Sequence, residues 1–328
     1  MKEKKILLPS DPSGVRSPWF WIGTWSMGGE GFGKGDLRES LDVINAAIEA
    51  GISHFDTAGF YAHGRSEELL ARAVGKKRGS IFVSTKGGLV WEGRRVEHRG
   101  SPSELEEQLH ASLKRLRTDY IDLFQLHWPD PEIPVGESID ALKSFKQSGM
   151  IRYWGVGNLT EAQVDSFLRA DKDIPHQVHY NPVHRSDDVL NAGKERCINC
   201  ITSPLEQGLL GAGKSSKGKN GIGKSDVRNR NPRFGEANVI KWSQELQRLA
   251  GASKVVSVLA WICSRPYVNA VISGPRKKDQ LDELASFLKF VEKEDLISSA
   301  KGISVLSETK TKDKVRPEIW EHLSEGPQ

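Results

Sequence analysis

The chain has 328 residues, of which 37% are hydrophobic and 27% are charged. Its 47 basic and 43 acidic side chains leave a formal net charge of only +4, which is typical of a soluble globular protein and requires no nucleic-acid partner. No apolar stretch approaches the roughly 20 residues needed to cross a bilayer. The apolar run at residues 6–8 ends at Pro9, so we expect neither a membrane span nor a signal peptide.

The three cysteines Cys197, Cys200 and Cys263 cannot all pair within one chain. This count favours a reducing compartment over a disulfide framework, and we therefore expect a cytoplasmic protein. Cys197 and Cys200 have the spacing of a metal or redox pair, but the sequence offers no second pair of ligands near them. We interpret them as buried core residues and predict no metal site.

Short runs of β-branched and aromatic residues alternate with helical periodicity from about residue 19 to residue 290. This alternation is typical of parallel βαβ units. It predicts eight strands, which begin at Trp19, His54, Ile81, Tyr120, Ile151, His176, Ile198 and Asn269.

A helix is predicted after each strand. Residues 37–51 form one candidate that ends at Gly51, and residues 101–116 form another that opens with Ser101 and Pro102. Eight repeats favour closure, and the glycine pattern of an open dinucleotide-binding sheet does not follow the first strand. We therefore predict a (β/α)8 TIM barrel as a single domain over residues 1–328, with its core at about 19–290 and a polar tail from about 298.

Two long loops interrupt the alternation, at residues 87–100 and 208–237. Loops that follow barrel strands build the active site, so we expect both to have functional roles. Residues 208–215 match the phosphate-loop pattern G-x-x-x-x-G-K-S. The glycine-rich residues after them lack the helical periodicity that such a loop requires, so we do not expect ATP binding.

Four residues with acid–base chemistry are predicted to converge in a barrel. Asp56, Lys86 and His127 stand at the ends of predicted strands two, three and four, and Tyr61 lies in the loop after strand two. An ammonium group lowers the pKa of a nearby phenol, and a carboxylate keeps a buried lysine charged. His127 would orient a carbonyl oxygen or share its proton. Taken singly, each residue has an ordinary structural explanation as a cap, a packing residue or a surface charge.

Five segments, in this order, resemble the successive motifs of the aldo-keto reductases: DTAGFYAHGRSEELLARAV, TKGG, TDYIDLFQLHWPDP, IRYWGVGN and ITSPLEQGLL. The resemblance extends over about residues 19–290. It implies an NADPH-dependent oxidoreductase that reduces an aldehyde or ketone to an alcohol. It also implies that Tyr61 donates the proton, that Asp56 and Lys86 are its charge partners, and that His127 positions the carbonyl.

The resemblance further implies a cofactor site that crosses the barrel mouth without a Rossmann domain. The nicotinamide is assigned to Gly23, Thr24, Trp25, Asn158 and Gln177. The pyrophosphate is assigned to Ser203, Leu205 and Gln207, with positive charge from Lys214, Lys217 and Lys219. The adenosine end is assigned to Ser273, Gly274, Arg276, Gln280 and Glu283.

Arg276 determines the predicted cofactor preference. A guanidinium pairs with a phosphate through two parallel hydrogen bonds, so Arg276 favours NADPH over NADH. The alternative is that Arg276 and Lys277 only begin a solvated helix. Two departures from the family bear on affinity: Thr202 replaces an aromatic residue that many members stack on the nicotinamide, and Leu284 replaces an asparagine near the adenine. The alternative to an enzyme is therefore a regulatory or binding barrel with little turnover.

The substrate is predicted to be a small carbonyl compound held by Trp25, Phe60, Trp91 and Trp128, which would wall an apolar pocket. A second prediction uses the basic residues of the first long loop to recognise an anionic or sugar-like substrate, although such charges are usually solvated. These residues are Arg94, Arg95, His98 and Arg99. The natural substrate, the physiological direction and the oligomeric state stay open.

Overall fold

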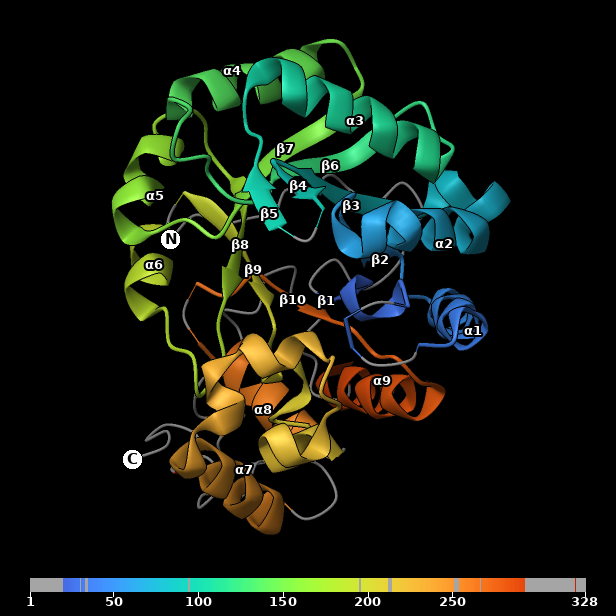
Figure 1. The fold of residues 1–328 in the computed structure, drawn as a ribbon, viewed down its shortest axis with the longest axis vertical. Coiled ribbons are helices and arrows are strands. Elements are labelled where there is room, and N and C mark those ends of the chain that lie inside the picture. The colour runs from blue at the N-terminus through green and yellow to red at the C-terminus, as the bar shows by residue number, and fades with distance from the viewer. Residues whose placement is uncertain are drawn as a thin grey trace.

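A computed structural model describes residues 20–29, 31–32, 35–93, 95–194, 196–211, 214–250, 254–265, 267–292 and 322. Eight parallel strands close into a barrel in the neighbour order β1-β10-β9-β8-β7-β6-β3-β2 (Figure 1). The predicted TIM barrel and its eight strands are confirmed. The strands are β1 (Phe20–Gly23), β2 (His54–Asp56), β3 (Phe82–Gly87), β6 (Ile121–Leu126), β7 (Ile151–Gly157), β8 (Ile174–His179), β9 (Cys197–Thr202) and β10 (Ala270–Ser273).

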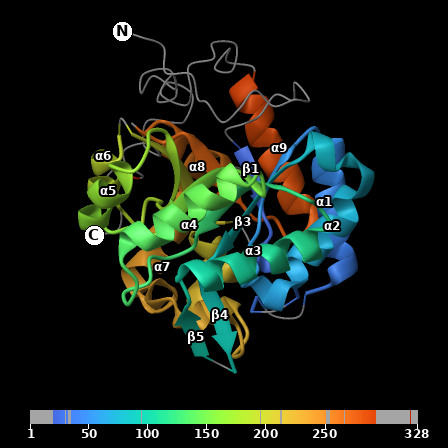
Figure 2. The same cartoon turned by 90° about the horizontal axis from the view of Figure 1, so that it is seen from above.

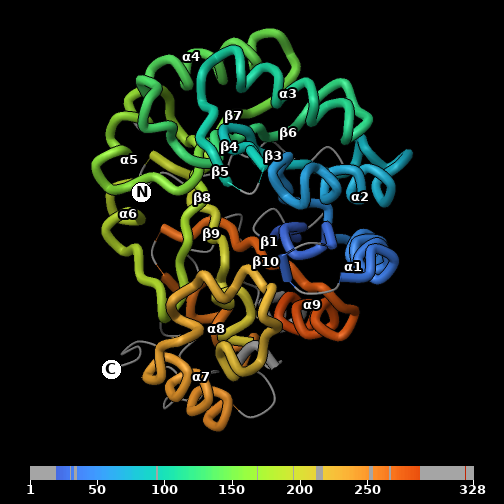
Figure 3. The backbone as a smooth tube through the Cα atoms, viewed as in Figure 1, coloured from blue at the N-terminus to red at the C-terminus, as the bar shows by residue number. Residues whose placement is uncertain are grey.

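Helices follow every barrel strand and surround the sheet (Figure 2). The last helix packs beside the first, so the two ends of the barrel fold meet where β1 pairs with β10 (Figure 3). The helices are α1 (Leu37–Glu49), α2 (Arg65–Val74), α3 (Pro102–Leu116), α4 (Val135–Gln147), α5 (Glu161–Leu168), α6 (Asp187–Ala192), α7 (Ala237–Ala250), α8 (Lys254–Cys263) and α9 (Lys278–Glu292).

The predicted helix boundaries arise from local capping. Ser101 accepts a hydrogen bond from the backbone N–H of Glu104, and the Glu104 carboxylate accepts one from the N–H of Ser101, which completes a capping box at the start of α3. At the end of α1, Gly51 has a φ of 85°, a conformation that favours glycine. Both ends were predicted from these residues.

The first long loop contains a hairpin that was not predicted. Strands β4 (Leu89–Glu92) and β5 (Arg95–His98) pair antiparallel outside the barrel. Gly93, with a φ of 59°, allows the tight reversal after β4. The prediction of a loop at residues 87–100 is therefore wrong, since four-residue strands are too short to show a clear period in the sequence.

The second long loop agrees with its prediction. Between residues 214 and 236 the described chain forms only short 3₁₀ turns, at Lys214–Gly221, Val227–Arg230 and Pro232–Gly235. An α-helix does not follow Lys214 in this part of the chain, so the backbone lacks the helix N-terminus that a phosphate loop uses.

Alternation along the strands divides the core into two layers. Outward-facing residues such as Phe20 and Ile22 belong to a large cluster with the helices, whereas Trp21 and Cys200 belong to a small cluster inside the barrel. All three cysteines are buried, as predicted. In β2 and β3 the same alternation turns Asp56 and Lys86 inward at the carboxyl-terminal end.

Among the described helices, none is by itself long and apolar enough to cross a membrane. Only α7 and α8 taken together have the required length and composition, and they are bent by 102°. Helix α8 is buried at nearly every position, as a core helix of a barrel would be.

Candidate active site

Three of the predicted catalytic side chains are joined by hydrogen bonds at the barrel mouth. Lys86 at the end of β3 places its Nζ 2.7 Å from Asp56 Oδ2 at the end of β2, and 3.4 Å from the Tyr61 hydroxyl. The Nζ also donates to the carbonyl oxygen of Thr57 at 2.7 Å. Because the side chains of Lys86 and Asp56 are only 1% and 4% exposed, this ion pair is shielded from solvent.

Burial and the neighbouring charges shift the pKa values of Tyr61 and Lys86 in opposite directions. Burial raises the pKa of Tyr61 above its ordinary value, and Lys86 offsets only part of the increase. The prediction of a lowered phenol pKa is therefore wrong in its net direction, because desolvation of the phenolate outweighs the ammonium. Burial alone would lower the pKa of Lys86, but Asp56 and Tyr61 raise it. At neutral pH the phenol is protonated and the lysine charged.

His127 completes the group on the next strand. Its ring lies edge-on to that of Tyr61, with the centroids 5.7 Å apart. Burial, together with Lys86, holds the pKa of His127 well below its ordinary value, so the imidazole is neutral. A neutral imidazole orients a carbonyl oxygen through its N–H but is a weak proton source, which favours the orienting role over proton sharing.

Three polar side chains support Asp56, and two of them, Ser84 and Gln125, were not predicted from the sequence. Its Oδ1 accepts hydrogen bonds from Ser84 Oγ at 3.0 Å and from Gln177 Nε2 at 2.6 Å. Gln125 in turn donates to Ser84 at 2.8 Å. Ser84 and Gln125 could have been found as polar residues at inward-facing positions of otherwise apolar strands.

The residues assigned to the nicotinamide surround this group. Thr24 is buried and donates through its N and Oγ1 to the carbonyl oxygen of Asp56. Gln177 contacts Asp56, and Asn158 Nδ2 donates to the carbonyl oxygen of His127 at 2.9 Å. Gly23 pairs with Asp56 in the sheet. These polar groups at the inner end of the mouth fit an amide-bearing aromatic ring.

The segment assigned to the pyrophosphate follows β9. Ser203 and Gln207 have φ values of 49° and 54°, in the left-handed region that non-glycine residues rarely adopt. Leu205 packs against the main core, and Thr202 is half-buried at the end of β9. Lys217 and Lys219 in the following loop are exposed, and the side chain of Lys214 lies outside the described residues.

At the adenosine end, Arg276 lines a cavity of about 310 Å³ together with Phe32, Asp36, Glu39, Lys277 and Gln280. The Arg276 guanidinium donates to the carbonyl oxygen of Phe32 at 2.6 Å, and the backbone N–H of Arg276 donates to Gln280 Oε1 at 2.7 Å. Arg276 and Lys277 suit a phosphate group, whereas Asp36 and Glu39 do not.

The remaining residues assigned to this end differ in exposure. Ser273 is buried, Glu283 is half-buried, and Gly274 is exposed, with its carbonyl oxygen bonded by Ser26. Leu284 belongs to the main core. Leu284, which replaces the asparagine that many family members have here, is thus a packing residue of α9.

The four aromatic residues assigned to the substrate lie beyond the ends of barrel strands, and two of them stack on each other. Phe60 and Trp91 stack with ring centroids 4.6 Å apart and planes within 10°, and Trp91 Nε1 donates to the carbonyl oxygen of Phe60 at 3.0 Å. Trp25 stacks on Tyr61 at 6.1 Å. Trp25 and Trp128 are large apolar side chains with 37% and 43% of their surface exposed. This arrangement favours an apolar or aromatic substrate.

The basic residues of the first long loop fit an anionic substrate less well. Arg99 forms ion pairs with Glu92, Glu97 and Glu104 at 3.1–3.5 Å, so its charge is balanced within the protein. Arg95 and His98 are exposed, and Arg94 lies outside the described residues.

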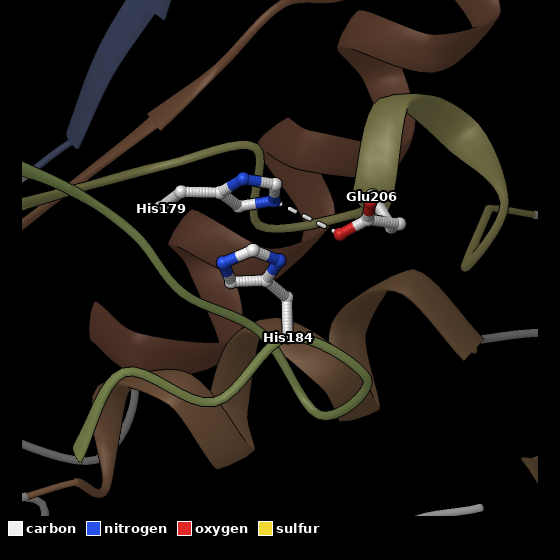
Figure 4. Close-up of side chains that lie close together, drawn as sticks. All are labelled: His179, His184 and Glu206. Atoms are coloured by element: carbon white, nitrogen blue, oxygen red, sulfur yellow. Dashed lines mark hydrogen bonds and ion pairs between the residues drawn. The ribbon is translucent and has the colours of Figure 1, made fainter. Parts of the chain in front are cut away.

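A cluster of His179, His184 and Glu206, which the sequence did not predict, lies beside the segment assigned to the pyrophosphate (Figure 4). His179 Nε2 lies 2.9 Å from Glu206 Oε2, and the two imidazole rings stack with centroids 3.8 Å apart. Glu206 is within the quoted motif ITSPLEQGLL. An acidic residue inside a segment assigned to an anionic cofactor was the signal that could have indicated this cluster.

One known protein sequence and one solved structure resemble this chain over nearly its whole length. The chain is 32% identical over 320 residues to the aldo-keto reductase YhdN of Bacillus subtilis, which covers 94% of this chain and 95% of that protein. The structure of the glycerol dehydrogenase of Gluconobacter oxydans matches with a TM-score of 0.73 at 27% identity, covering 94% of this chain and 97% of that one.

Other relatives have different stated roles and cofactors. A probable voltage-gated potassium channel subunit beta of Oryza sativa is 32% identical, covering 83% of this chain and 87% of that protein. The NADH-specific methylglyoxal reductase of Escherichia coli is 33% identical, covering 58% and 64%. An aldo-keto reductase of Klebsiella pneumoniae in complex with NADPH shares the fold, with a TM-score of 0.62, 22% identity and 91% coverage of both chains.

The family assignment rests on a match of residues 20–304 to the aldo/keto reductase family. These residues include every barrel strand and the complete group of Asp56, Tyr61, Lys86 and His127. This chain is therefore a member of the aldo/keto reductase family.

Proposed function

We propose that this protein is an NADPH-dependent reductase that converts an aldehyde or ketone to an alcohol, with Tyr61 as the proton donor. The observation that carries the proposal is the buried Lys86–Asp56 pair, whose ammonium lies 3.4 Å from the Tyr61 hydroxyl. His127 lies beside the same hydroxyl-bearing ring. Together they provide an acid, its charge support and a carbonyl-orienting group at one point.

The residues divide the chemistry between them. A nicotinamide cofactor held by this site would, when bound, supply hydride to the carbonyl carbon. Tyr61 transfers its phenolic proton to the carbonyl oxygen, and Lys86 stabilises the phenolate that remains. Asp56 keeps Lys86 charged, and neutral His127 holds the carbonyl oxygen towards Tyr61. The aromatic residues at the entrance exclude water and admit an apolar carbonyl compound.

The preference for NADPH rests on Arg276. Arg276 and Lys277 present positive charge to a cavity at the outer end of the mouth, where a 2′-phosphate would be neutralised. Asn158 and Gln177 at the inner end are suited to the carboxamide. One relative is named as NADH-specific. Membership of the family therefore does not decide between NADPH and NADH, and the preference proposed here depends on Arg276 itself.

Steady-state loss of NADPH absorbance with neutral aromatic and aliphatic aldehydes tests the proposal. We expect carbonyl-dependent consumption with at least one class, and faster consumption with NADPH than with NADH. Tight NADPH binding without consumption by any aldehyde would instead support the regulatory barrel. That second candidate is favoured by one observation, the similarity to a protein named as a potassium channel subunit beta.

A further inference from the structure

Glu206 is a buried carboxylate for which the proposed chemistry has no use. Its side chain is 1% exposed, yet it stays ionised, since hydrogen bonds outweigh the effect of burial and lower its pKa to about 2. Oε2 accepts from Asn181 Nδ2 at 2.6 Å and pairs with His179 Nε2 at 2.9 Å. Oε1 accepts from Asn231 Nδ2 at 2.6 Å. A buried carboxylate with this many hydrogen bonds fixes the positions of the side chains that bond to it.

The three partners lie on two different segments of the barrel mouth. His179 ends β8 and Asn181 follows it, whereas Asn231 belongs to the long loop after β9. Asn181 Nδ2 also donates to the carbonyl oxygen of Ser203 at 3.0 Å, and Asn231 Nδ2 contacts Gln207 Oε1 at 3.3 Å. Glu206 therefore connects the proposed pyrophosphate segment to the loop and to β8.

The same segment has a strained backbone. Ser203, Glu206 and Gln207 have φ values of 49°, 45° and 54°, although none of them is glycine. Such conformations persist only where surrounding contacts enforce them. The hydrogen bonds to Glu206, and the bond from the Arg228 guanidinium to the carbonyl oxygen of Gln207 at 3.2 Å, are contacts of this kind.

The residues that precede Asn231 in the long loop contact the loop after β1, which is two strands from β9 in the barrel order. Val227 N donates to the carbonyl oxygen of Gly31 in the loop after β1, and the Arg228 guanidinium lies 5.3 Å from the Phe32 ring centroid. The loop thus reaches the cavity that Arg276 lines. Asn231 is held at Glu206 and Val227 at the β1 loop, so this part of the loop can move away from the mouth only if both contacts break.

A metal ion is a poorer explanation of the His179, His184 and Glu206 cluster. The two imidazole planes are parallel within 8° and stacked at 3.8 Å, so one ion cannot lie in both ring planes (Figure 4). Both oxygens of Glu206 already accept hydrogen bonds from protein donors.

We propose that Glu206 is a positioning residue that sets how long the dinucleotide stays bound. It does so by fastening the loop that contains Asn231 to the segment assigned to the pyrophosphate. The inference rests on the proposed cofactor-dependent function. Since the pyrophosphate is common to both cofactors, Glu206 acts equally on NADPH and NADH, whereas Arg276 discriminates between them.

Asn231→Asp is the sharpest test. The carboxylate keeps the acceptor that caps the turn at Arg233 N, but it removes the donor to Glu206 and places a like charge beside it. Glu206→Gln is the second variant. Asn220→Asp makes the same change at an exposed position of the same loop and serves as the control.

Stopped-flow protein fluorescence would measure dissociation of NADPH and NADH, together with KM and kcat for one aldehyde. We expect roughly tenfold faster dissociation of both cofactors from Asn231→Asp, with a raised cofactor KM and an undiminished kcat. The control should match the wild type. Dissociation within about twofold of wild type, loss confined to NADPH, or a lowered kcat at unchanged KM would overturn the inference. Failure of the wild type to bind either cofactor would instead refute the proposed function itself.

Discussion

At the scale of single residues, the proposed chemistry depends on how burial and charge are balanced around Lys86. Burial raises the pKa of Tyr61 and lowers that of His127, and Lys86 offsets the first effect while adding to the second. The outcome is a protonated phenol beside a neutral imidazole. This supports the proposed donation of a proton by Tyr61, and it favours orientation over proton sharing for His127, the two roles that the residue types alone left open.

Tyr61→Phe should remove the proton donor and leave the packing of the ring unchanged. We expect kcat for aldehyde reduction to fall by roughly 10²- to 10⁴-fold, with the NADPH dissociation constant nearly unaltered. Tyr153→Phe removes a hydroxyl from β7, outside the proposed site, and is the matched control. Turnover of Tyr61→Phe close to wild type would exclude Tyr61 as the donor.

Arg276→Ala should weaken NADPH binding far more than NADH binding. Loss of a hydrogen-bonded charge pair predicts roughly tenfold weaker NADPH binding or more, whereas NADH has no 2′-phosphate to lose. Titration of protein fluorescence with each cofactor gives both constants, and Lys278→Ala, an exposed change two residues away, is the control. Equal weakening of both cofactors would refute the assignment.

At the scale of elements, the β4–β5 hairpin positions Trp91, one of the residues assigned to the substrate. Trp91 on β4 stacks on Phe60, while Gln108 of α3 bonds to Gly88 N and to the carbonyl oxygen of Arg99 at the base of the hairpin. Arg99 adds ion pairs to Glu97 and Glu104. These contacts fix the position of Trp91 relative to Phe60.

Trp91→Leu should therefore change specificity more than chemistry. Loss of the aromatic stack predicts that kcat/KM for a bulky aromatic aldehyde falls roughly tenfold relative to a small aliphatic aldehyde. Leu37→Ala alters an exposed apolar residue of α1, outside the hairpin, and should leave the ratio unchanged. A proportional loss for both aldehydes would show that Trp91 does not contact the substrate.

At the scale of the whole molecule, the barrel buries histidines that the unfolded chain would protonate. His176 on β8 is fully buried, and burial lowers its pKa to about 4. Between pH 6.5 and 4 the unfolded chain binds a proton that the folded chain does not, so stability falls as the pH falls. Glu206, with its lowered pKa, adds a loss at still lower pH.

His176→Gln should reduce the pH dependence of stability. For the wild type, we expect His176 to contribute a loss of about 2 kcal/mol in unfolding free energy between pH 7 and pH 5. Urea unfolding at both pH values measures this loss, which should be absent from the variant. His110→Gln on the exposed face of α3 is the control. An unchanged pH dependence in His176→Gln would contradict the account.

The sequence by itself determined the number of barrel strands, their order along the chain and the strand ends that carry Asp56, Lys86 and His127. These follow from local periodicity and turn residues, which act over a few positions. The β4–β5 hairpin was not predicted, because two four-residue strands are too short to show a distinct period in the sequence.

Only the tertiary structure decided what each group contacts. Gln177 bonds Asp56 across 121 positions, Arg276 bonds Phe32 across 244, and Glu206 gathers donors from two loops. It also reversed the predicted pKa of Tyr61, because desolvation depends on the complete surroundings of a side chain. Barrel closure creates these distances and this burial together, and no short stretch of sequence contains either.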